Sequence, residues 1–174
     1  MNGIRRIFWV FVRLLLRLRY RITTDGVEQL EQLTGPVLVL PNHPAYVDPP
    51  TVMSHTAAGL FQKGLRQPLR PLVFSGTYRV PPLLPLMKLV RAFEVPDLSS
   101  ASQEAASRTA QLIDGVVERV QAGESFLIYP SGRLQRGNRE VVGSARFVHE
   151  LVSRCPELQV VLIRTRGLWG SLFS

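Results

Sequence analysis

Short, uninterrupted apolar runs alternate along the chain with longer segments of helical periodicity. The runs at residues 36–40, 70–74, 92–95, 125–129 and 158–163 have the length and turn-rich borders of strands. Helical patterns lie between them at residues 51–60, 100–122 and 140–153, and the longest opens on Ser100 and Gln103 like a capping box. The alternation predicts a single α/β domain with a central mixed, largely parallel sheet flanked by helices, and a site in the loops at one sheet edge.

The connecting segments give weaker signals. Residues 21–26 are predicted to form a short strand and turn, residues 27–33 a helical turn, and residues 75–78 a turn. Residues 80–90 are very apolar and contain three prolines, which predicts a helix that begins late. This last segment could belong to the core, form a wall for a long apolar substrate or make a second membrane contact.

Residues 1–22 are treated separately from the domain expected over residues 23–174. Residues 4–21 contain six arginines and no acid, and their apolar runs are too short to cross a bilayer. Basic and bulky apolar residues separate at helical spacing: Arg6, Arg13 and Arg17 against Phe8, Trp9, Phe11 and Leu15. The pattern favours an amphipathic helix in the interface of an anionic membrane. A helix packed on its own domain, or one that binds nucleic acid, is the alternative.

Composition, net charge and cysteine content limit the classes of protein to which this chain can belong. With 174 residues, 45% hydrophobic and 20% charged, the chain is globular and long enough for one core. The net charge of +8 requires an anionic partner, which could be nucleic acid, a membrane surface or a phosphorylated substrate. A single cysteine, Cys155, excludes an internal disulfide and is compatible with a reduced, cytosol-facing compartment.

The segment at residues 42–50 carries the first candidate chemistry. His43 follows an apolar strand in a proline-stiffened loop, and Asp48 comes five residues later. An imidazole can accept a proton near neutral pH, and a carboxylate can fix its tautomer and stabilise the imidazolium. A structural alternative stays open: Asp48 could serve only to start a helix, and His43 could be a loop histidine bonded to backbone.

A second candidate site follows the strand at residues 125–129. The loop at residues 130–139 contains two glycines and three arginines and precedes a helix, so it offers amides and guanidinium groups to a phosphate. A solvated basic loop would have the same composition. The chain contains no Gly-x-Ser-x-Gly elbow, Walker loop or paired metal ligands.

Taken together, Asn42-His43-Pro44-Ala45-Tyr46-Val47-Asp48 and the segment from Phe126 to Arg133 resemble motifs of the glycerolipid (lysophospholipid) acyltransferase family. That family has a histidine and an aspartate separated by four residues, and later a strand that ends in Pro-Glu-Gly with an arginine close behind. The likeness extends from residues 26–30 through residues 85–95, which occupy the place of the family's second motif.

The resemblance implies roles for these residues. His43 would be the general base and Asp48 would orient it, while Ser131, Gly132, Arg133 and Arg136 would bind the acceptor's phosphate. The reaction would move an acyl group from acyl-CoA or acyl-carrier protein to lysophosphatidate or a related lysophospholipid. Neither a metal nor a prosthetic group is expected. The protein would be monotopic or peripheral at the cytoplasmic face of the inner (plasma) membrane, with an anionic membrane surface as its partner.

Three departures from the family pattern support a competing hypothesis. Ser131 stands where the family usually has glutamate, and the second motif lacks its usual arginine, so Arg79, Arg91 or the later arginines would have to bind phosphate. The proline-containing fourth motif is missing, as expected of a minimal or C-terminally truncated member. The alternative is a non-catalytic membrane- or lipid-binding relative. A nucleic-acid module rests on charge alone, and no nucleic acid partner is expected.

Overall fold

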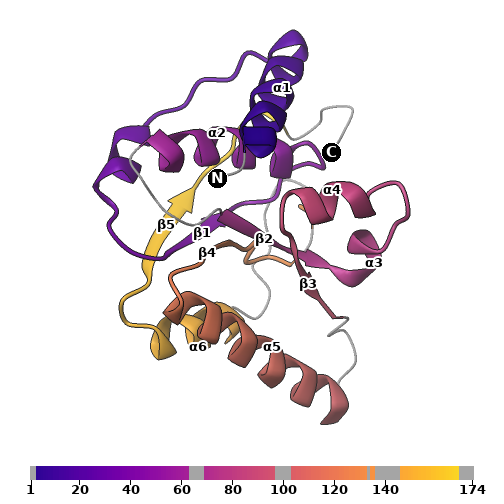
Figure 1. The fold of residues 1–174 in the computed structure, drawn as a ribbon, viewed down its shortest axis with the longest axis vertical. Helices are drawn as coiled ribbons and strands as arrows, with labels where there is room; N and C mark the ends of the chain where they lie inside the picture. Colours follow the sequence, from indigo (N-terminus) through magenta and orange to yellow (C-terminus); the bar gives the residue numbers. More distant parts are fainter. Residues whose placement is uncertain (1–2, 63–68, 97–102, 133, 136–145, 169–174) are drawn as a thin grey trace.

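The structure is a computed structural model that describes residues 3–62, 69–96, 103–132, 134–135 and 146–168. It is a three-layer α/β fold, with a five-stranded sheet between two layers of helices (Figure 1). The strands are β1 (Val37–Pro41), β2 (Leu69–Phe74), β3 (Phe93–Val95), β4 (Ser125–Leu127) and β5 (Gln159–Ile163). The helices are α1 (Gly3–Arg19), η1 (Val27–Gln32), α2 (Asp48–Gln62), α3 (Ser75–Tyr78), α4 (Leu84–Leu89), α5 (Gln103–Gln121) and α6 (Arg146–Arg154).

The sheet has the strand order β3-β2-β4-β1-β5, and every strand pair in the described part of the chain is parallel. Strand β1 lies between β4 and the edge strand β5, with Leu38 opposite Phe126 of β4 and Val160 of β5. Its residues are buried throughout, as expected of a strand covered on both faces. Parallel pairing places the carboxyl ends of all five strands at one edge of the sheet.

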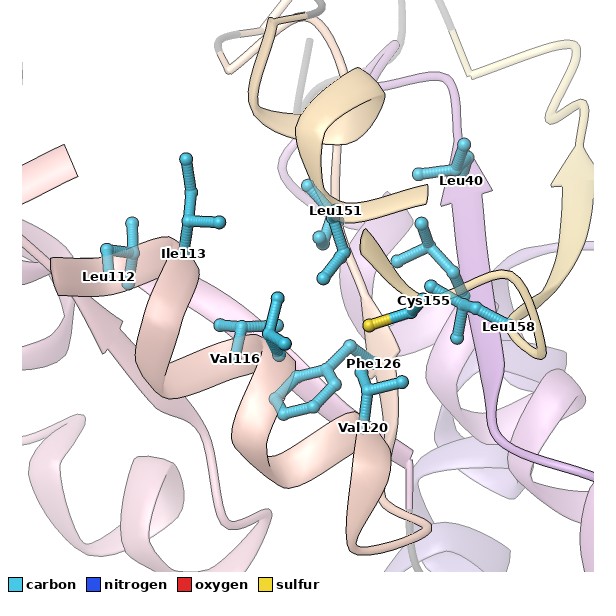
Figure 2. Packing of buried hydrophobic residues seen from close by; sticks show 12 residues of the cluster. Leu40, Leu112, Ile113, Val116, Val120, Phe126, Leu151, Cys155 and Leu158 are labelled. Atoms are coloured by element: carbon cyan, nitrogen blue, oxygen red, sulfur yellow. The ribbon is translucent and has the colours of Figure 1, made fainter. Parts of the chain in front are cut away.

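Successive residues of β1 enter two different cores because side chains alternate across a sheet. Val37 and Val39 join the cluster under α2, to which Trp9 of α1 also packs. Leu38 and Leu40 join the cluster under α5 and α6. Figure 2 shows this second cluster, which contains Leu112, Ile113, Val116, Val120, Phe126, Leu151, Cys155 and Leu158. The helix predicted at residues 100–122 is confirmed as α5, and its buried apolar residues form the face that covers the sheet.

Substitution in this second cluster gives a test of the packing. Leu151 of α6 is fully buried, so Leu151→Ala is expected to lower the free energy of unfolding by about 2–5 kcal/mol. Val152 is the next residue and is 36% exposed, so Val152→Ala should change it by less than about 1 kcal/mol. Chemical denaturation followed by circular dichroism measures both. Equal losses in the two variants would contradict the assignment of Leu151 to the core.

Most predicted elements are confirmed, and two differ: residues 75–78, predicted as a turn, form the short helix α3, and the strand predicted within residues 21–26 is absent. The five apolar runs form the five strands, and the proline-rich segment at residues 80–90 forms a helix that begins only at Leu84. Residues 21–25 form no strand. Most of their side chains are exposed and polar, so this segment has no apolar face to bury against the sheet. The loop residues 136–145 and Ser100 lie outside the described residues.

Candidate active site

His43 lies at the carboxyl edge of the sheet, two residues beyond the end of β1. The neighbouring strand β4 ends at the same edge, because Val39 is paired with Leu127 and the backbone amide of Ile128 donates to the carbonyl of Val39 at 2.9 Å. The chain that follows β4 therefore leaves the sheet beside the chain that follows β1. Two segments that are distant in sequence meet at this point.

The structure brings His43 and Asp48 together. Nδ1 of His43 lies 4.0 Å from an oxygen of the Asp48 carboxylate, and the Asp48 side chain is fully buried. Asp48 is also the first residue of α2, so it occupies the position that the structural alternative predicted for it. Its carboxylate nevertheless faces Nδ1 of His43. Since Nδ1 faces the carboxylate, the other ring nitrogen, Nε2, is the atom available to a substrate.

Tyr129 is a residue of this site that the sequence did not reveal. Its ring stacks on that of His43, with centroids 4.1 Å apart and planes at 29°. Tyr129 belongs to the same face of the sheet as Leu127, the face that α2 covers, and this places its phenol near Asp48. The only sequence signal was its position as the last residue of a buried apolar run. Stacking restricts the rotation of the imidazole.

The electrostatics of the site keep both rings uncharged. Burial lowers the pKa of His43 to about 4, so the imidazole is neutral at physiological pH and can accept a proton. Burial, and after it the negative charge of Asp48, raises the pKa of Tyr129 above its ordinary value. Asp48 can stabilise positive charge that forms on His43 during proton transfer. The arrangement suits a general base that becomes charged only in the transition state.

The loop after β4 closes against His43. Gly132 adopts φ 64°, a conformation that favours glycine, and its amide donates to the carbonyl of Tyr129 at 2.9 Å. Ser131 is buried beside this turn, and the amide of Gln135 donates to the carbonyl of His43 at 2.9 Å. Ser131 and Gly132 thus belong to the segment between Tyr129 and Gln135, both of which contact His43. The other two residues expected to bind phosphate, Arg133 and Arg136, lie outside the described residues.

A comparison with protein families bears on this geometry. A family model described as Acyltransferase matches residues 21–162, most of the chain. The chain belongs to this acyltransferase family. Its activity is therefore acyl transfer in general, and the suspected kinship is confirmed at that level. No curated protein matches the sequence.

Asn42 fixes the segment that carries the histidine of this acyltransferase. The side-chain amide of Asn42 donates to the carbonyl of Thr165 at 2.9 Å, and its oxygen accepts from the amide of Thr165 at 2.6 Å. The backbone amide of Asn42 also donates to the carbonyl of Ile163, at 3.3 Å. These bonds tie the His43 segment to the chain that follows β5, although the two are 123 residues apart.

The two described arginines considered as substitutes in the acyltransferase's second motif are already paired. The guanidinium group of Arg91 lies 3.5 Å from Glu124, which precedes β4 and so lies at the amino end of that strand, opposite His43. Arg70 and Arg119 contact the same carboxylate, at 2.6 and 3.6 Å. Arg79 lies beyond β2 and pairs with Glu94 at 2.6 Å. This geometry does not favour Arg91 as a ligand near His43.

Helix α4 lies in the proline-rich segment at residues 80–90, for which a place in the core, a substrate wall and a membrane contact were considered. None of its residues is buried, and only Val90, directly after it, reaches the core. The leucines and the methionine of α4 are half-buried. This exposure argues against a purely structural role in the core, whereas a substrate wall and a second membrane contact both remain predictions.

Proposed function

We propose that this acyltransferase transfers a fatty acyl group from acyl-CoA or acyl-carrier protein to the free hydroxyl of lysophosphatidate or a related lysophospholipid, in phospholipid biosynthesis or remodelling. The observation that carries the proposal is the pairing of His43 with Asp48 at 4.0 Å, next to the turn at Ser131 and Gly132. A buried neutral base without a serine elbow suits direct attack by the acceptor's own hydroxyl on a thioester.

The proposed reaction needs one proton acceptor and no covalent acyl-enzyme. As the acceptor oxygen attacks the thioester carbonyl, Nε2 of His43 takes the hydroxyl proton. The carbon–oxygen bond forms, the carbon–sulfur bond breaks, and the imidazolium returns its proton to the leaving thiolate. Asp48 stabilises the imidazolium between these steps, and stacking on Tyr129 holds the ring in place. This path requires no cofactor.

The acceptor's phosphate is assigned to the loop after β4. Ser131 and Gly132 lie beside the His43 segment, and Arg133 and Arg136 follow them in sequence. A guanidinium group can donate two parallel hydrogen bonds to phosphate oxygens. Two such groups here would hold the acceptor's phosphate while the acceptor's free hydroxyl contacts His43.

We also place the reaction at an anionic membrane, at the cytoplasmic face of the inner membrane and with a peripheral attachment. The net charge of +8, the arginine-rich helix α1 and a membrane-resident acceptor support this placement. None of the helices in the described ranges has the length and apolar content needed to cross a bilayer.

Acyl transfer to lysophosphatidate in detergent micelles tests the proposal. Purified protein with acyl-CoA is expected to release free thiol and to form phosphatidate, detected by mass spectrometry, only when lysophosphatidate is present. Glycerol 3-phosphate, lysophosphatidylcholine and acyl-carrier-protein thioesters define the acceptor and donor. Thiol release that is independent of every acceptor would overturn the proposal. Membrane binding without any turnover would favour the non-catalytic alternative.

The acid limb of the rate profile gives a second expected result. A base must be neutral to act, so kcat/KM should fall as the pH drops through about 4, and not near the ordinary value of 6.5. Because the unfolded chain takes up this proton at higher pH, the free energy of unfolding should also fall between pH 6.5 and about 4. Circular dichroism at each pH separates the two effects. An acid limb near 6.5 in folded protein would show that the base is a solvated group.

A further inference from the structure

Helix α1 has two apolar faces. One face packs on α2, where Leu16 is buried and Trp9 contacts the cluster that contains Val52 and Met53. The other face points away from the domain, and Figure 1 shows α1 on the outside of α2. Its exposed residues recur at helical spacing and form one stripe, which consists of Ile4, Ile7, Phe11, Leu14, Leu15 and Leu18. The stripe has no cover in the described part of the protein.

Cationic groups without a counter-ion lie at the seam between α1 and α2. Arg13 and Arg17 are one turn apart on α1, and their charges act on His55 of α2. Nε of Arg13 is shielded from solvent and has no hydrogen-bond partner, and neither arginine forms an ion pair within the described ranges. Helix α1 contains no acid, and the single acid of α2, Asp48, lies beside His43.

The environment of His55 is consistent with a local excess of positive charge. Burial lowers the pKa of His55, the hydrogen bond with the Thr51 carbonyl raises it, and the charges of Arg13 and Arg17 lower it further. A guanidinium group that is partly removed from water costs free energy unless an anion compensates for it. An anion at this seam would offset the repulsion between the charges of Arg13 and Arg17.

We propose that Arg13 and Arg17, with His55 beside them, form a binding site for the phosphate of an anionic phospholipid while the stripe inserts into the same leaflet. A guanidinium fork matches a phosphate, and lipid phosphates lie just above the acyl chains that would receive the stripe. At 3.6 residues per turn Arg17 lies beside the stripe, the position at which headgroups meet an interfacial helix, whereas Arg13 lies further round the helix, at the boundary with α2. The inference rests on the membrane attachment proposed above, and it adds a ligand class and a site.

Vesicle flotation of the full chain tests this site. The probes are vesicles of neutral phosphatidylcholine and vesicles with added phosphatidylglycerol. The double variant Arg13→Gln/Arg17→Gln should lose about 10-fold or more of its affinity for the anionic vesicles and keep its weak affinity for neutral ones. Arg146→Gln/Arg154→Gln removes the same charge from α6 on the opposite face, and should bind as wild type does. Thermal melts confirm that each variant is folded.

A charge-conserving variant separates a phosphate site from general attraction to a charged surface. Arg13→Lys/Arg17→Lys keeps the charge but not the fork, so it should also bind the anionic vesicles less tightly than wild type. Equal binding of this variant and wild type, or of the glutamine variant and the α6 control, would overturn the site and leave membrane attachment intact. Failure of wild type to bind any vesicle would overturn both. Neither result depends on acyl transfer in micelles.

Discussion

His43→Ala is expected to lower kcat for acyl transfer by about 100- to 10,000-fold, with a much smaller change in KM. The reason is that His43 is the only group in the described site that is both neutral and placed to take the hydroxyl proton. Its pKa is lowered to about 4, whereas the Tyr129 phenol has a raised pKa and keeps its proton. Phosphatidate formation from acyl-CoA and lysophosphatidate in micelles measures the loss.

The matched control is His149→Ala, which removes an exposed histidine of α6 and should leave the rate unchanged. Since His43 stacks on Tyr129, its removal could also disturb packing, so His43→Gln provides a second variant that keeps a planar polar group. Both His43 variants should melt close to wild type while remaining inactive. Full activity in a folded His43→Ala protein would remove the assigned base and the mechanism built on it.

The sequence was sufficient for the inner strands β1 and β4 because they are buried on both faces. Runs such as Val37-Leu38-Val39-Leu40 have no polar residue to offer to solvent, so their assignment does not depend on partners. The failure at residues 21–25 has the opposite cause: β-branched residues favoured a strand locally, but no apolar face gave it a partner.

Helix α1 shows a further limit of periodicity. Its basic and apolar sides were predicted from spacing, but spacing cannot tell which apolar face packs on the domain. In the structure Trp9 faces the core, Phe11 faces outward, and Arg13 lies at the seam with α2. Contact with α2 decides this, and α2 is remote in sequence.

The candidate site also contains some contacts that the sequence could predict and others that it could not. His43 and Asp48 are five residues apart, so the loop alone could predict their approach, and the structure brings them to 4.0 Å. Tyr129 reaches His43 only through the pairing of β1 with β4, and Asn42 reaches Thr165 only through β5. Such contacts depend on strand order and register, which no local pattern encodes. The approach of the loop that carries Ser131 to the His43 segment follows from that same pairing.

Asp48→Asn is expected to lower kcat by about 100-fold or more, because the amide cannot stabilise the imidazolium that His43 becomes. Asp48 is a positioning residue in this account, since it acts through Nδ1 of His43 at 4.0 Å. Without the carboxylate the charged form of His43 becomes still less favourable, so the acid limb of kcat/KM should move below about 4. KM for the acceptor should change little, because Asp48 is fully buried and does not reach the solvent side of the site.

Tyr129→Phe is the matched control for this substitution. It removes the phenol that faces Asp48 but keeps the ring that stacks on His43, so kcat should fall by less than about 10-fold. If Asp48 served only to begin α2, Asp48→Asn would keep its rate, since asparagine caps a helix about as well as aspartate. A normal rate and an unmoved acid limb in folded Asp48→Asn protein would therefore restore the structural explanation. A large loss in this variant with a small one in Tyr129→Phe would assign the effect to the carboxylate's charge on His43.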